Sequence, residues 1–118
     1  MAAEFGEYVR KCREQKKAKS ADFSLRKLAI RIGVEPSYLS KVERGQEAPP
    51  SEATIAALAR ELDEDPDVLL AMAGKVSSDL QRIIRKRPKL FAQLIREMKN
   101  MPNHAVLRVV REVRDGDW

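Results

Sequence analysis

The sequence is poor in the residues that most often hold metals or carry catalysis. Among its 118 residues there is one cysteine, Cys12, and one histidine, His104. A lone cysteine forms no intrachain disulfide and no cysteine zinc site, and a lone histidine excludes paired-histidine metal sites. No phosphate-binding glycine loop and no plausible nucleophile–base set is present. We therefore expect no enzyme, no metal and no cofactor.

Long apolar runs and strand patterns are missing as well. The apolar run that includes Leu69 to Ala73 is, like every other in the sequence, too short to span a membrane. The first residues show no basic start followed by a long apolar stretch, which is the pattern of a secretory signal. No segment alternates apolar and polar residues with β-branched enrichment. The expectation is an all-α cytoplasmic protein without membrane contact.

Charge, in contrast, is abundant and divided into blocks. The net charge is +5, but 11 basic and 4 acidic residues lie between Arg10 and Arg44. Residues 47–67 hold 7 acidic residues and a single arginine, and residues 77–118 hold 10 basic and 5 acidic ones. Such segregation favours a defined electropositive face for a polyanionic partner. The alternative is that each charge only solvates its helix.

Apolar residues recur at helical spacing along the chain and predict about five helices before Gly74 and three after it. The first helix is expected to end near Gln15, before a polar, basic connection. The expected N-caps are Ser24, Ser51, Asp65 and, for the last helix, Asn103 beside Pro102; the expected stops are Gly33, Gly45 and Gly74. This predicts a helix-turn-helix domain over residues 1–75 and a helical extension over residues 76–118.

Residues 24–45, SLRKLAIRIGVEPSYLSKVERG, carry the most informative pattern: two short amphipathic helices around a turn at Gly33. The small Ala29 allows the two helices to pack closely, and Leu39 and Val42 face inward. The polar side chains that remain near the outer face, within reach of base edges and phosphates, are Ser37, Tyr38, Ser40, Lys41 and Arg44.

This stretch, with the following ATIAALARELDEDPDVLL helix pair, resembles the helix-turn-helix domain of the XRE family, the Cro and phage-repressor type. The resemblance covers about residues 5–74 and implies a five-helix bundle whose third helix enters the DNA major groove. It implies base reading by Ser37 and Lys41 and an internal ion pair between Arg13 and Glu43. The implied DNA-contacting set in and around the motif is Ser24, Glu35, Pro36, Ser37, Tyr38, Ser40, Lys41, Arg44 and Gln46. Leu25 departs from the family, many of whose members carry glutamine there.

Two basic segments lie outside that motif. The connection between the first two helices is longer than in the family and holds Lys16, Lys17 and Lys19, which either contact DNA or belong to a solvated connector. The second segment has three possible interpretations: a solvated helix face, a further phosphate contact or an RNA-binding patch. Its members are Arg82, Arg85, Lys86, Arg87 and Lys89.

The extension carries more apolar side chains than a short hairpin can bury, so we expect it to form a dimer interface. The expected interface residues are Leu90, Phe91, Leu94, Ile95, Val106, Leu107, Val109, Val110 and Val113. The favoured function is a homodimeric regulator of transcription, expected to repress, that binds a palindromic operator in double-stranded DNA. The alternatives are an antitoxin or mobile-element regulator whose last helices bind a protein partner, and an RNA-binding or structural module.

Overall fold

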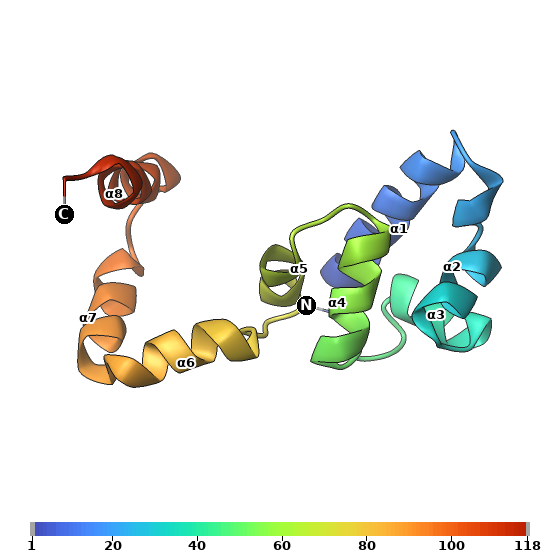
Figure 1. Cartoon of the computed structure of the whole chain (residues 1–118), viewed down its shortest axis with the longest axis horizontal. Coiled ribbons are helices and arrows are strands. Elements are labelled where there is room, and N and C mark those ends of the chain that lie inside the picture. The colour runs from blue at the N-terminus through green and yellow to red at the C-terminus, as the bar shows by residue number, and fades with distance from the viewer. Residues whose placement is uncertain (1, 118) are drawn as a thin grey trace. The chain divides into compact units, whose positions relative to one another are not determined.

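The structure, a computed structural model, describes residues 2–117, and every regular element in that range is helical (Figure 1). The first five α-helices are α1 (Ala2–Lys17), α2 (Leu25–Ile32), α3 (Pro36–Glu43), α4 (Glu52–Glu61) and α5 (Pro66–Met72). A short 3-10 helix, η1 (Ala21–Phe23), lies between α1 and α2, and α6 (Ser78–Lys86), α7 (Pro88–Met98) and α8 (Asn103–Asp115) follow. The all-α fold expected from the sequence is confirmed. Within the described range, no helix has the length and apolar character needed to cross a membrane.

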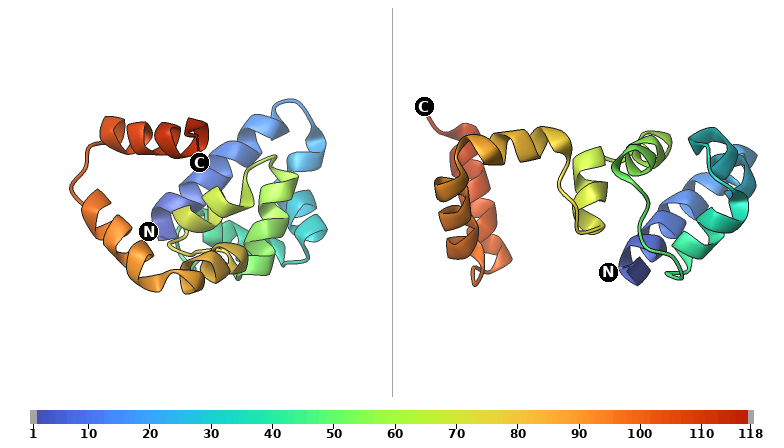
Figure 2. Two further views of the ribbon diagram at one scale, coloured as in Figure 1. Left: turned by 60° about the vertical axis from the view of Figure 1, so that its left-hand side comes forward. Right: turned by 90° about the horizontal axis from the view of Figure 1, so that it is seen from below.

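The chain divides into two units between Ser78 and Asp79. The first unit has one hydrophobic core, in which α1 packs against α3 and α4 packs against α5 (Figure 2). Its largest fully buried side chains come from all five helices: Phe5, Val9, Leu28, Leu39, Val42, Ile55, Leu58, Leu69 and Leu70. Each such side chain contributes roughly 1.5–3 kcal/mol on burial, which is why this unit carries its own stability.

Helix ends in the first unit follow the local chemistry of the sequence. The hydroxyl oxygen of Ser24 accepts a hydrogen bond from the Lys27 amide, and that of Ser51 accepts one from the Thr54 amide. Gly33 ends α2 with φ +77°, a left-handed conformation that glycine adopts without steric cost. These caps fix where α2 begins and ends, and therefore where α3 can start.

The boundaries differ from the sequence-based expectation at two places. Helix α1 runs to Lys17 rather than ending near Gln15, and Ser20 then caps η1 by accepting a hydrogen bond from the Asp22 amide. Asn103 was expected as the cap of the last helix, and this was wrong. Asn103 is the first residue of α8, and the cap position belongs to Pro102, whose ring offers no hydrogen-bonding side chain.

A glycine sets how closely α1 approaches α3. Gly6 is buried, and a Cβ atom at this position would collide with the carbonyl oxygen of Val42 and lie 2.8 Å from that of Glu43. Only a residue without a side chain therefore allows the backbones to come this close. The contact holds the C-terminal end of α3 against α1.

The second unit has a different character, because none of the described residues of α6, α7 and α8 is buried. Many of its apolar side chains remain at least half exposed, including Leu90 at 64% and Val113 at 60%. Helices of this length do not supply enough buried area for a core of their own. The exposed apolar side chains of this unit are thus available for contacts outside it.

Candidate nucleic-acid interface

Helix α3 presents a polar outer face over a buried inner one. Leu39 and Val42 lie in the core, whereas Ser37 and Lys41 are exposed. Ser37 and Lys41 are four residues apart in the sequence, and therefore lie one above the other on the same side of the helix. This spacing allows both side chains to enter a DNA groove together.

The other predicted residues of this helix lie around that face. Tyr38 is half-buried and packs against the core, so its ring serves stability as well as any contact. Ser40 is also half-buried, and its carbonyl oxygen accepts a hydrogen bond of 3.2 Å from Arg44 Nε. Exposed residues flank the helix at both ends, namely Glu35 before it and Arg44 and Gln46 after it. Pro36 is half-buried at the first helical position, where its missing N–H costs nothing.

A buried ion pair holds α3 in place. Arg13 donates from Nε and Nη2 to the two carboxylate oxygens of Glu43, at 2.8 and 2.9 Å, and from Nη1 to the Phe23 carbonyl oxygen at 3.2 Å. The hydrogen bonds to Glu43 raise the pKa of Arg13 although its burial opposes the charge. The pairing implied by the family resemblance is thus present, and it ties α1 to α3 and to η1.

The start of α2 carries the predicted phosphate contact, Ser24. Its side chain is half-buried and caps the helix, and its hydroxyl hydrogen remains available to donate to an anion. Leu25, the next residue, is half-buried and packs against the core, so it contributes to the fold.

The three lysines predicted to share the connection between α1 and α2 lie in different settings. Lys16 and Lys17 belong to α1, because that helix extends beyond its expected end, and only Lys19 lies in the connection. Lys16 Nζ forms an ion pair of 2.6 Å with Asp63, whereas Lys17 and Lys19 are exposed.

Phe23 anchors this connection. Lys16 Nζ lies 5.4 Å and Arg31 Cζ lies 4.9 Å from the centroid of its ring, within the range of cation–π attraction. Arg31 also pairs with Glu61 at 3.0 Å and donates to the Asp22 carbonyl oxygen. The connection is therefore bonded to α2 through Arg31, which in turn pairs with Glu61 of α4, and to α1 through Arg13.

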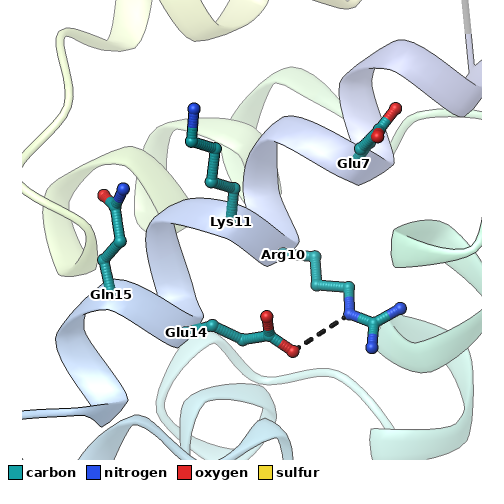
Figure 3. Close-up of a pocket in the computed structure, with 5 residues that line it drawn as sticks. All are labelled: Glu7, Arg10, Lys11, Glu14 and Gln15. Carbon is teal, nitrogen blue, oxygen red and sulfur yellow. Dashed lines mark hydrogen bonds and ion pairs between the residues drawn. The ribbon is translucent and has the colours of Figure 1, made fainter.

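Between α1, α2 and α3 lies a notch of about 190 Å³ that the sequence reasoning did not anticipate. Its lining residues are Arg10, Arg13, Leu25, Ser40, Glu43 and Arg44. Arg10 pairs with Glu14 at 3.1 Å on the surface of α1 (Figure 3). One sequence signal was available, because Arg10 precedes Arg13 by one helical turn and so shares its side of α1.

The remaining titratable groups of α1 have structural roles. The Cys12 thiol donates to Glu64 at 3.4 Å, and burial raises the pKa of Cys12, which disfavours the reactive thiolate. A hydrogen bond to the same Glu64 carboxylate raises the pKa of Tyr8 to about 12. A second hollow, of about 540 Å³, has Glu7, Arg10, Lys11, Glu14 and Gln15 of α1 among its lining residues and carries mixed charge (Figure 3). Among residues 2–117, no three histidine, cysteine or acidic side chains are grouped so as to hold a metal ion.

A family model described as a helix-turn-helix domain matches residues 4–72, more than half of the chain. The match begins in α1 and ends at the last residue of α5, so it takes in η1 and all five helices of the first bundle. Comparison with curated proteins and with solved structures gave no match.

Proposed function

Because the chain belongs to the helix-turn-helix domain family, we propose that it is a transcription regulator of the XRE type that recognises a specific sequence in double-stranded DNA. The observation that carries this proposal is the outer face of α3, where Ser37 and Lys41 are exposed side by side above a buried inner face. A helix of this kind fits the major groove, where each base pair offers a distinct pattern of donors and acceptors.

In this proposal Lys41 and Ser37 read base edges, with Tyr38, Ser40 and the exposed ends of α3 at the groove walls. The ammonium group of Lys41 is suited to the two acceptor atoms of guanine, and the hydroxyl of Ser37 donates or accepts. Pro36 offers an apolar surface for a thymine methyl group. Glu35 lies at the start of the helix, where its carboxylate can accept from a cytosine amino group.

Phosphate contacts would hold the domain in register on the duplex. Ser24, Arg44 and Gln46 lie at helix ends, where side chains commonly bond phosphate oxygens. Lys17 and Lys19 are exposed and add sequence-independent attraction, while the ion pair with Asp63 reduces the contribution of Lys16. The basic cluster of residues 82–89 runs from α6 into the start of α7, in the second unit, and is a further candidate for backbone contact.

We also propose that the second unit pairs two copies of the chain. Support comes from its apolar side chains: Leu90, Leu94, Ile95, Leu107, Val110 and Val113 are exposed, and Phe91, Val106 and Val109 are half-buried. Burying such side chains contributes roughly 1.5–3 kcal/mol each, so several of them exposed in water favour association. A two-fold pair would match a palindromic operator, at which bound dimers most simply repress transcription.

The exposed apolar side chains favour one second candidate, in which the last helices bind a different protein, as in an antitoxin.

One experiment tests the main proposal: selection of bound sequences from a random pool of DNA duplexes, with single strands and RNA as competitors. A palindromic motif, with half-sites about 34 Å or a multiple apart, supports the proposal. Preference for single strands or RNA, or no enriched motif, contradicts it.

A further inference from the structure

The notch between α1, α2 and α3 brings together arginines from two helices. Arg10 and Arg13 come from α1, and Arg44 follows α3, beside Ser40. The hollow has about 190 Å³ of space, and a water molecule in the liquid takes about 30 Å³. It is therefore roomy enough for a tetrahedral oxyanion and a few waters.

The charge of the notch is positive. Among the described residues that line it, Glu43 is the one carboxylate, and the two hydrogen bonds from Arg13 satisfy it. Arg10 and Arg44 carry the lining charge that Glu43 does not balance. Both line the same hollow, where a bound anion would lower their mutual repulsion, so the notch suits a negative ligand.

Both excess arginines keep donors for that ligand. The bond that the described residues give Arg44 uses Nε, directed to the Ser40 carbonyl oxygen, which leaves its terminal amino groups for an anion. Arg10 uses Nε for Glu14, and this pair is more than half exposed on both sides. Exposed pairs of this kind are weak, so an anion with two free oxygens competes well for Arg10.

We propose that the notch binds one phosphate of the DNA backbone, held by Arg10 from α1 and Arg44 from the end of α3; this rests on the proposed function. Arginine binds phosphate through paired N–H groups, which fixes orientation as well as position. Ser40 belongs to α3, and Arg44 directly follows it. A phosphate bound here therefore sets how deep α3 lies in the groove. Arg10 is then a positioning residue that makes no contact with bases.

The test compares variants on a fluorescein-labelled DNA duplex of random sequence, about two helical turns long, because a phosphate contact does not depend on sequence. Arg10→Gln is expected to weaken binding about tenfold at low salt and to flatten the dependence of the binding constant on salt. Lys11→Gln is the matched control. It removes the same charge from the next residue, whose side chain points away from that of Arg10 in Figure 3 and is not among the described residues that line the notch, and is expected to change binding little.

A double-mutant cycle tests whether the two arginines share one phosphate. The double variant Arg10→Gln with Arg44→Gln is expected to weaken binding by clearly less than the product of the two single fold-changes. For Lys11→Gln with Arg44→Gln, the fold-change of the double variant should equal that product. Arg10→Lys, which keeps the charge but loses the paired N–H groups, should lie between wild type and Arg10→Gln. Unchanged melting temperatures would show that the exposed Arg10 affects binding and not folding.

Two results would overturn the proposal, and they are distinguishable. If wild type binds the duplex and Arg10→Gln behaves like Lys11→Gln, or if the arginine effects multiply, the notch holds no shared phosphate while DNA binding stands. If wild type does not bind the duplex at any salt concentration, the proposed function itself fails, and the phosphate site fails with it.

Discussion

Arg13 of α1 and Glu43 of α3 form a two-pronged ion pair inside the first unit, with N–O distances of 2.8 and 2.9 Å. The side chains are only 7% and 3% exposed. Glu43 is the last residue of α3, and Gly6 lets the backbone of α1 approach the same place. The pair and the close approach together fix the end of α3 from which Arg44 emerges.

The first prediction concerns this pair. Glu43→Ala should lower the free energy of unfolding by about 3–5 kcal/mol, because it leaves the buried Arg13 charge without a partner. Replacing both residues by apolar ones, Arg13→Met with Glu43→Leu, should cost much less. Denaturant unfolding measures both, with the exposed Glu47→Ala as control. A loss under about 1 kcal/mol for Glu43→Ala is the range of a surface pair and would contradict this account.

The second prediction concerns base reading by α3. Lys41→Ala should cost about 1–3 kcal/mol on the best selected operator and relax the preference at one base pair in each half-site. Binding measured on the operator and on single-base variants of it checks this. A loss of equal size on every sequence would make Lys41 a phosphate contact.

Local signals were sufficient to predict most helix boundaries of the first unit. Ser24, Ser51 and Gly33 act on residues a few positions away, so their roles can be read from neighbouring sequence. The same holds for Ser37 and Lys41, whose common face follows from helical spacing. The helix-turn-helix pattern can therefore be predicted from the order of the residues alone.

Long-range contacts were beyond that reasoning. Lys16 pairs with Asp63, which lies 47 residues further along the chain. This ion pair could not be predicted from the basic residues next to Lys16 in the sequence. The collision that makes Gly6 necessary depends on the carbonyl groups of α3. The notch likewise exists only because three helices meet there, and Arg10 alone looks like any surface arginine of a charged helix.

The third prediction separates the three lysines. Replacing Lys17 and Lys19 together by alanine should flatten the plot of log binding constant against log salt by about 0.9 for each phosphate that the variant no longer neutralises. Lys16→Ala should change that slope less and lower the melting temperature more, because Lys16 contacts Asp63 and the Phe23 ring. Equal slopes for wild type and the double variant would show that Lys17 and Lys19 contact no phosphate.

The fourth prediction uses the contact between Glu52 and the first residue of α6. The Ser78 hydroxyl and amide both donate to the Glu52 carboxylate, at 2.7 and 2.6 Å, and these hydrogen bonds lower the pKa of Glu52. A carboxyl with a lowered folded-state pKa stabilises the fold at neutral pH, and this contribution is lost as the pH falls through that pKa. Glu52→Gln should therefore melt below wild type at pH 7, with the difference shrinking in acid. Glu47→Gln, which removes the same charge from an exposed position, is the matched control, and a constant gap for Glu52→Gln would contradict the linkage.

The last prediction concerns assembly through the second unit. The first unit extends through Ser78, so a chain truncated after that residue keeps the whole bundle and the contact with Glu52. This chain should stay folded by circular dichroism, sediment as a monomer and bind a single half-site without cooperativity. In the full chain, Leu94→Glu should have the same effect, because it places a charge among exposed apolar side chains of α7. Gln93→Glu is the matched control, since it adds the same charge at the neighbouring, polar position and should leave the dimer intact. If the truncated chain still sediments as a dimer, the interface lies in the first unit, and the apolar side chains of α7 and α8 must then serve a different protein.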